Sequence, residues 1–349
     1  MLKIVLIFLI FLSNSSYALD IDEAIKSTIE NNPKVQIAFE RLKESKELIE
    51  NAYNKKLPTI TSTISGTYSN SDSSTSTANT NAETFTDKYK LTLSQNLYDS
   101  GEKDLEIERA KILFDNESLN FKITIQNLIL SAIEGYLTVI NYQKSLDASK
   151  KNFESVSRFL DETKTKFDLG SATLYDFQNA ESAFAIAETN FFIAQQNYNL
   201  SKITFNRIVG LKPLDLQDVV DFNKDIDLMT FLNKVENNNY NILLLDNNIK
   251  NSEILLAKEK LSSKPSLDLS TSVEYSDSGR IDSGTEKING AFGLTLTIPI
   301  FQQNNDKSDI RKFQSKLLQS ELIFDDSMED LKIQATNLYK NYLISKSNI

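Results

Sequence analysis

The chain has 349 residues, of which 40% are hydrophobic and 25% charged, and its formal net charge is −10. It has no histidine and no cysteine, which excludes disulfides, the usual metal sites and any histidine-based catalytic triad. No carboxylate pair stands out among its acids, so we expect no enzymatic activity and no cofactor, and the acidity argues against a nucleic-acid partner.

Residues 1–18 have the pattern of a secretory signal peptide. Lys3 supplies a positive charge, Ile4 to Leu12 form an unbroken apolar run, and Ser16 and Ala18 are the small residues that a signal peptidase reads. The alternative is a buried N-terminal helix, which would need polar residues in the run to be amphipathic. No later segment approaches the roughly 18 apolar residues of a membrane-spanning helix. We therefore expect export, as a soluble periplasmic protein or a β-barrel.

Two early segments, at about 59–69 and 85–98, alternate apolar and polar residues with period two, which predicts strands. The polar run from Ser69 to Thr84 between them is interpreted as a solvated loop. The same arrangement recurs at about 265–275 and 288–301, with a second loop from Ser276 to Lys287. The sequence therefore predicts two β-hairpins with long polar loops.

Strands with one apolar and one Ser/Thr/Asn face fit either a half-buried sheet of a soluble protein or a membrane barrel with lipid outside and water inside. Their lengths favour the barrel, because a tilted membrane strand needs about 9–11 residues. Four strands cannot close a barrel, for which about eight is the lower bound, so several subunits must pool strands, and a cyclic trimer would supply twelve. The residues expected to face the lumen are Thr61, Thr63, Lys88, Lys90, Thr92, Ser270, Ser272, Thr295 and Thr297.

The segment from about 101 to 209 is predicted to be a helical hairpin. It is almost free of proline and glycine, and a helix from Gly101 to Phe167 would be roughly 100 Å long. Aromatic and leucine residues recur every seven residues on both sides of Gly170, which predicts a left-handed coiled coil. A short turn at about 168–172 makes the two helices antiparallel. The expected register pairs residues whose numbers sum to about 340, with large side chains facing small ones, as in Phe153 with Ala187 and Leu160 with Ala180.

An internal repeat joins these elements. Asn31-Asn32-Pro33 corresponds to Asn238-Asn239-Tyr240, and Leu57-Pro58 corresponds to Lys264-Pro265. We divide the chain into a first repeat at 19–210, a connector of a middle domain at 211–230 and a second repeat at 231–349. The second long helix begins near Asn305 and stops after about 45 residues, so we expect the second repeat to be incomplete and its apolar stripe (Ile310, Phe313, Leu317, Leu318 and Leu322) to be unpartnered.

Several motifs occur in the order and spacing of one family. They are Asn31-Asn32-Pro33, Leu57-Pro58, Leu97-Tyr98-Asp99-Ser100-Gly101, the run from Lys166 to Asp176, and Asn206-Arg207-Ile208-Val209-Gly210. Across nearly all of residues 19–349 the chain resembles the TolC family of outer-membrane efflux and secretion ducts. The expected fold is therefore α plus membrane β, with two helix–hairpin–helix repeats.

The resemblance implies a homotrimer with a twelve-stranded barrel in outer-membrane lipid, continued by a coiled-coil tunnel through the periplasm. It also implies a periplasmic adaptor at the helical tip and an inner-membrane RND or ABC transporter behind it, in a tripartite efflux pump or a type I secretion system. The tip residues are Lys166, Phe167, Gly170, Thr173 and Asp176. Two of these residues also have simpler explanations than docking. Gly170 is suited to a turn, and Asp176 is suited to capping a helix.

Three rival functions are weaker. An exported coiled-coil adhesin or scaffold would not need four amphipathic strands. A periplasmic adaptor would carry one helical hairpin between small β-domains. An enzyme without histidine or cysteine would need a carboxylate pair.

Overall fold

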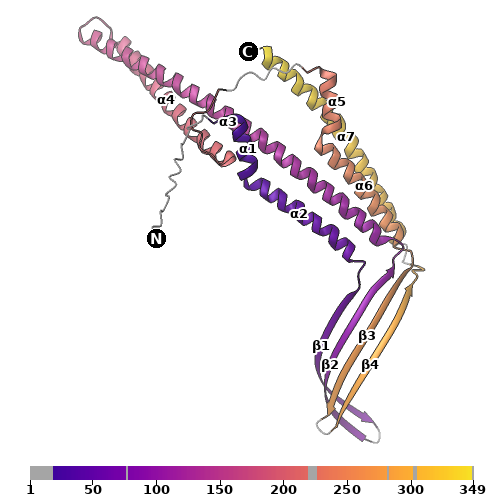
Figure 1. Cartoon of the computed structure of the whole chain (residues 1–349). Helices are drawn as coiled ribbons and strands as arrows, with labels where there is room; N and C mark the ends of the chain where they lie inside the picture. The colour runs from indigo at the N-terminus through magenta and orange to yellow at the C-terminus, as the bar shows by residue number, and fades with distance from the viewer. Residues whose placement is uncertain (1–18, 76–77, 219–225, 281–282, 302–304, 348–349) are drawn as a thin grey trace, which may run out of the picture. The chain divides into compact units, whose positions relative to one another are not determined.

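The computed structural model describes residues 19–75, 78–218, 226–280, 283–301 and 305–347 (Figure 1). The chain forms two compact units, Met1–Phe39 with Phe121–Asp225 and Glu40–Asn120 with Ile226–Ile349. The signal peptide predicted at 1–18 and residues 219–225 of the predicted connector lie outside the described residues.

The first unit is helical. It contains α1 (Ile21–Asn31), the start of α2 (Pro33–Asn54), the larger part of α3 (Glu102–Asp168) and α4 (Leu174–Val209). Asn32 separates α1 from α2, since its side-chain oxygen accepts a 3.0 Å hydrogen bond from the backbone N–H of Lys34. Pro33 then takes the first helical position, where its missing N–H costs nothing.

The helices α3 and α4 form the predicted antiparallel hairpin (Figure 1). The ring of Phe153 lies 5.4 Å from that of Phe184 and 5.5 Å from that of Phe191, so Phe153 is level with the residues between them, Ala187 among them. This agrees with the expected register. The aromatic rings of the hairpin also pack on one another, which the sequence did not predict.

A small core holds the first unit together. Its buried residues are Leu19, Ala24, Ala132, Tyr136, Val139, Ile140, Phe205 and Val209. The hydroxyl of Tyr136 lies 2.8 Å from the carbonyl oxygens of both Leu19 and Gln217. Burial raises the pKa of this tyrosine. The hydroxyl therefore ties the chain before α1 and the chain after α4 to the middle of α3.

Side chains of α1 and its C-cap also satisfy the end of α4. Ser27 donates a 2.8 Å hydrogen bond to the carbonyl of Val209, and Asn32 donates one of 2.9 Å to that of Ile208. Gly210 ends α4 with φ of 81°, a left-handed conformation that glycine adopts without strain. The motif ending at Gly210 thus acts as a helix terminator.

The second unit combines helices with one sheet. It contains the rest of α2, the start of α3, α5 (Leu228–Asn238), α6 (Tyr240–Leu261) and α7 (Asn305–Ser347). The strands are β1 (Thr59–Thr75), β2 (Ala78–Tyr98), β3 (Ser266–Arg280) and β4 (Ser283–Thr297). They form an antiparallel sheet of order β1-β2-β3-β4 (Figure 1).

The prediction of two long polar loops is wrong, because most of their residues belong to strands. Residues 70–75 and 78–84 pair as strand, and so do residues 276–280 and 283–287. These runs of Ser, Thr, Asn and Asp lack apolar alternation, but backbone hydrogen bonds of a ladder do not require it. At the other end β4 stops at Thr297, short of the expected residue 301, because Pro299 has no N–H to donate.

The repeat is visible in the helices of the second unit. Asn239 separates α5 from α6, and its side-chain oxygen accepts hydrogen bonds from the N–H groups of Asn241 and Ile242, at 2.9 and 3.2 Å. It thus corresponds to Asn32 of the first repeat. The stripe on α7 is only partly unpartnered, since Ile310, Phe313 and Leu317 are half-buried whereas Leu318 and Leu322 are exposed.

The expectation that no segment after residue 18 is long and apolar enough for a membrane-spanning helix is wrong. Helix α3 contains an 18-residue window with a mean hydropathy of 1.4, long and apolar enough by composition to cross a membrane. That window is 28% buried. Four apolar residues of α3, namely Ala132, Tyr136, Val139 and Ile140, pack in the core of the first unit.

Candidate functional site

The register of the sheet sorts its side chains onto two faces. Residues directly opposite each other on paired strands share a face, as Thr92 does with Thr61 on one side and Ser272 on the other. One face carries every residue expected to line a lumen: Thr61, Thr63, Lys88, Lys90, Thr92, Ser270, Ser272, Thr295 and Thr297. The structure brings all of them together on this polar face, and their contact with a lumen stays a prediction.

The opposite face is an exposed apolar band. On β2, β3 and β4, the alternating residues of this face are uncharged over nine-residue stretches, Tyr89–Leu97, Leu267–Tyr275 and Ile288–Leu296. A tilted strand needs about 9–11 residues to cross a bilayer. The side chains of Ile288 and Phe292 are 74% and 73% exposed. A continuous apolar surface of this kind marks an interaction site, and its height fits lipid.

A row of carboxylates ends the apolar band at one level. Asp87 is directly opposite Asp277, which is directly opposite Glu286. In the neighbouring row the rings of Tyr89 and Tyr275 lie 6.1 Å apart. Tyrosines between an apolar band and charges are typical of a lipid–water interface. The sequence interpretation missed this row, because Asp277 and Glu286 fall in the segment that was expected to be a loop.

The junction between sheet and helices is held by charges. The carboxylate of Glu106 on α3 lies 2.6 Å from the ammonium of Lys258 on α6 and 3.3 Å from the guanidinium of Arg109. The hydrogen bond from Lys258, followed by the charges of Lys258, Arg109 and Lys55, lowers the pKa of Glu106. This cluster connects the two repeats within the second unit, one helix from each.

The turn from β2 into α3 is built by the motif that ends at Gly101. Ser100 and Gly101 have φ of 60° and 94°. The carboxylate of Asp99 accepts hydrogen bonds from the N–H groups of Gly101 and Lys103, at 3.0 and 3.2 Å. The hydroxyl of Ser100 donates to the carbonyl of Pro265 at 2.9 Å. The motif thus caps α3 and joins it to the start of β3.

At the helical tip, α3 ends at Asp168 and Gly170 has φ of 74°. The carbonyl of Lys166 accepts hydrogen bonds from the N–H groups of Ser171 and Ala172, at 2.7 and 3.2 Å. The rings of Phe167 and Phe177 stack with centroids 5.4 Å apart. Lys166, Phe167 and Gly170 therefore have structural roles in the turn.

The capping role expected for Asp176 is present. The N–H of Asp176 donates to the hydroxyl of Thr173 at 3.2 Å, and the N–H of Thr173 donates to the carboxylate of Asp176 at 3.0 Å, which together form a capping box. Hydrogen bonds from the side chain and backbone of Thr173 lower the pKa of Asp176. The cap occupies this carboxylate, and a docking role for it stays a prediction.

The tip exposes apolar residues that the sequence interpretation missed. Leu169, Leu174 and Tyr175 are 75%, 56% and 72% exposed. These residues do not belong to the seven-residue rows from which the coiled coil was predicted. Apolar residues outside those rows have no place in the helix–helix contact, so the sequence could have indicated that they are exposed. A partner that docks at the tip would cover these three side chains.

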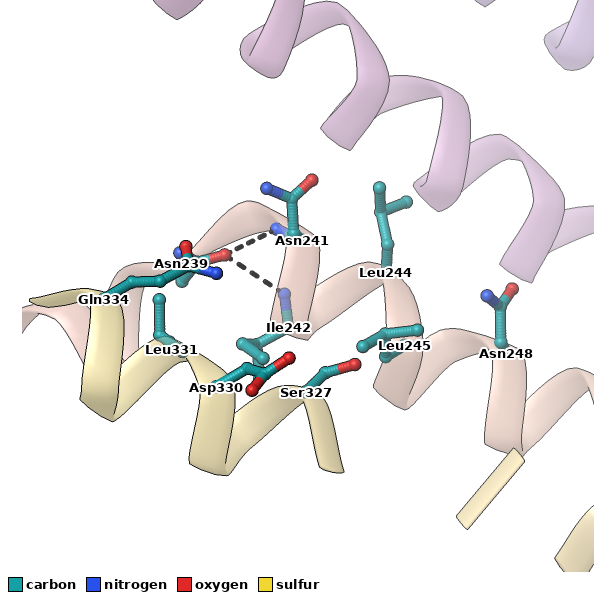
Figure 2. A pocket seen from close by; sticks show the side chains of 10 residues that line it. All are labelled: Asn239, Asn241, Ile242, Leu244, Leu245, Asn248, Ser327, Asp330, Leu331 and Gln334. Carbon is teal, nitrogen blue, oxygen red and sulfur yellow. Dashed lines mark hydrogen bonds between the residues drawn. The ribbon is translucent and has the colours of Figure 1, made fainter. Parts of the chain in front are cut away.

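A hollow of about 450 Å³ lies between α6 and α7. Figure 2 shows the side chains that line it. Leu244, Leu245 and Leu331 line it together with Asp330 and several amides. Among the described residues no group of three or more Asp or Glu could hold a metal ion. The hollow is a packing feature between two helices of the second unit, without a set of groups suited to catalysis.

An amphipathic sheet with an exposed apolar band, joined to a long helical hairpin, defines the class of outer-membrane channel subunits. The family model described as "Outer membrane efflux protein" matches residues 24–211, more than half of the chain. The chain belongs to this family, whose members are channels of the outer membrane with a helical periplasmic part.

Relatives and solved structures agree with this assignment. The outer membrane protein TolC of Escherichia coli is 24% identical over 305 residues, which are 81% of this chain and 60% of that protein. The chain therefore spans less than two thirds of this relative's length. The fold is similar to that of the Campylobacter jejuni CmeC outer membrane channel, with a TM-score of 0.70 and 16% identity over 94% of this chain and 74% of that one. It is also similar to the outer membrane protein VceC of Vibrio cholerae, with a TM-score of 0.68 and 14% identity over 94% and 79%.

Proposed function

We propose that the chain is a subunit of a trimeric outer-membrane duct that passively conducts substrate from the periplasm to the exterior. Four strands from each of three copies give a twelve-stranded barrel. The polar face lines its lumen and the apolar band contacts lipid. The repeats at 19–210 and 231–349, with the connector at 211–230, supply the helices of a tunnel below it. The protein is a conduit and not an enzyme.

The observation that carries this proposal is the sheet itself. In the part of the chain that the structure describes, β1 and β4 each have one neighbouring strand, so both outer edges are open. A long open edge invites pairing with another chain. When β4 of one copy pairs with β1 of the next, every edge is closed, as a strand in lipid requires.

The helical tip is the proposed contact for a periplasmic adaptor, with an inner-membrane RND or ABC transporter beyond it. Leu169, Leu174 and Tyr175 give it an exposed apolar surface beside Lys166. Both tripartite efflux pumps and type I secretion systems use a duct of this kind, so either system is a fitting context. The similarity of the fold to that of the CmeC outer membrane channel supports the conducting role.

The test uses neighbouring residues of β4 on opposite faces. Phe292→Lys places a charge in the apolar band, where a lysine at the bilayer midplane of a barrel costs about 2–4 kcal/mol. We expect it to remove the heat-modifiable trimer from the outer-membrane fraction. The matched control, Ala291→Lys, places the same charge on the polar face and should assemble normally. Equal recovery of both variants as a soluble monomer would contradict the proposal.

A further inference from the structure

The two faces of the sheet differ in the sign of their net charge. The polar face, from the described side chains of the strands, carries Lys88, Lys90 and Lys287 against Asp268 and Glu274. The rim of the apolar face carries only carboxylates at that level. The polar face thus has a positive balance in a chain whose net charge is −10.

The register gathers the lysines into two adjacent rows. Lys88 is opposite Ser276, which is opposite Lys287. Lys90, two residues along β2, is opposite Glu274. Rows two residues apart on one face are separated by about 7 Å. Three lysines and one carboxylate therefore share a small area, although Lys88 and Lys287 are 199 positions apart in the sequence.

The carboxylates of the polar face do not neutralise this group. Glu274 faces Lys90, which leaves Lys88 and Lys287 without a carboxylate in their own row. Asp268 lies eight residues from Ser276 along β3, roughly 26 Å away, and accepts a 2.9 Å hydrogen bond from Asn96. Among the ion pairs within 4 Å that the described residues form, none includes Lys88, Lys90 or Lys287.

We propose that Lys88 and Lys287 form a positively charged ring inside the barrel, toward its hairpin end, that favours anionic solutes. The inference rests on the proposed trimeric duct, in which each copy contributes both lysines to the ring. Rings of basic side chains are a device of anion-selective pores. Low-dielectric walls concentrate their field within the lumen. The carboxylates Asp87, Asp277 and Glu286 point to the other side of the sheet, where solvent and ions screen them.

The experiment measures ion selectivity in planar lipid bilayers. Purified protein is placed in a KCl gradient, and the reversal potential gives the chloride-to-potassium permeability ratio. The variant Lys88→Gln/Lys287→Gln should lower this ratio by about sevenfold or more, because a potential of about one kT raises the local chloride concentration about threefold and lowers the local potassium concentration by the same factor. Lys287→Glu should lower it as well, through reversal of charge in the same row.

The control removes two lysines elsewhere. Lys260→Gln/Lys340→Gln makes the same change of net charge with exposed residues of α6 and α7, and should keep the wild-type ratio. Heat-modifiability of each variant on a gel reports folding before recording. If the wild type and all variants form channels with the same permeability ratio, the proposed lysine ring is wrong, whereas the proposed duct is unaffected. Folded, heat-modifiable wild-type protein that never conducts would overturn both proposals.

Discussion

The helical core of the first unit and the sheet of the second use the same apolar residue types in opposite ways. Phe205 on α4 is 0% exposed and packs against Tyr136, with ring centroids 6.3 Å apart. Phe292 on β4 is 73% exposed. The first ring is enclosed by other residues of its own chain, whereas most of the second ring is left exposed. In the proposed duct, this difference separates the part that the chain stabilises alone from the part whose stability depends on lipid and further copies.

The largest expected effect comes from one substitution made in both regions. Phe205→Ala should lower the free energy of unfolding of the helical unit by about 3–5 kcal/mol, since it removes a buried ring and leaves a cavity. Phe292→Ala should change the same quantity by less than about 0.5 kcal/mol and should instead weaken retention in the outer membrane. Urea unfolding followed by circular dichroism in mild detergent measures the first effect. Similar losses for both variants would refute the distinction between the regions.

A smaller effect tests the polar part of the helical core. Tyr136→Phe keeps the ring and removes the hydroxyl that lies 2.8 Å from two carbonyl oxygens. Leaving the buried carbonyl of Leu19 and the partly buried carbonyl of Gln217 without this donor should cost about 1–2 kcal/mol. Amide hydrogen exchange near Leu19 and Gln217 should become faster. Tyr142→Phe, which removes a hydroxyl from a partly exposed ring on the same helix, is the control and should have little effect.

Local sequence patterns predicted the inner halves of the strands and the long hairpin. The alternation from Thr59 and from Ser266 is a period-two signal, and the aromatic rows around Gly170 are a period-seven signal. The outer halves of the strands were missed because runs such as residues 70–75 have no apolar alternation. Their pairing depends on backbone hydrogen bonds and on the propagation of an established register.

The pairing of β2 with β3 could not be predicted. It joins residues such as Lys90 and Glu274 that are far apart in sequence, and no local pattern specifies their register. The acidic row and the lysine rows both depend on it. The exposed tip residues were within reach of the sequence, since Leu169 and Tyr175 interrupt polar surroundings outside the seven-residue rows.

The sheet–helix junction should show an intermediate effect that depends on pH. Glu106 and Lys258 are 21% and 24% exposed, so their interaction is only partly screened. A double-mutant cycle with Glu106→Gln and Lys258→Met should give a coupling of about 1–2 kcal/mol at neutral pH. Because the folded pKa of Glu106 is lowered, the coupling is full above the unfolded value of about 4.3 and is lost as pH falls through the folded pKa.

The exposed pair Glu40 and Lys43 on α2 provides the comparison for that cycle. Their side chains are 66% and 54% exposed, so solvent screens their interaction at any pH. A coupling for Glu106 and Lys258 no larger than that of this pair, or one that persists unchanged in acid, would show that the junction is not held by its charges.

The smallest effect is expected at the tip, where the chain stabilises a fully exposed structure. Asp176→Ala removes one half of the capping box with Thr173, so the first turn of α4 should fray while the rest of the hairpin is unchanged. Amide hydrogen exchange in residues 174–177 should be faster than in the wild type at neutral pH. Glu181→Ala, farther along α4, is the control and should leave these amides unaffected.

The effect of Asp176→Ala on amide exchange should depend on pH. The pKa of Asp176 is lowered by its hydrogen bonds with Thr173, so the cap is fully present above the ordinary Asp value of about 3.9 and is lost as pH falls through the folded pKa. The exchange rates of wild type and Asp176→Ala should therefore converge in acid. If they stayed apart at every pH, the ionised carboxylate would not be the group that holds the turn.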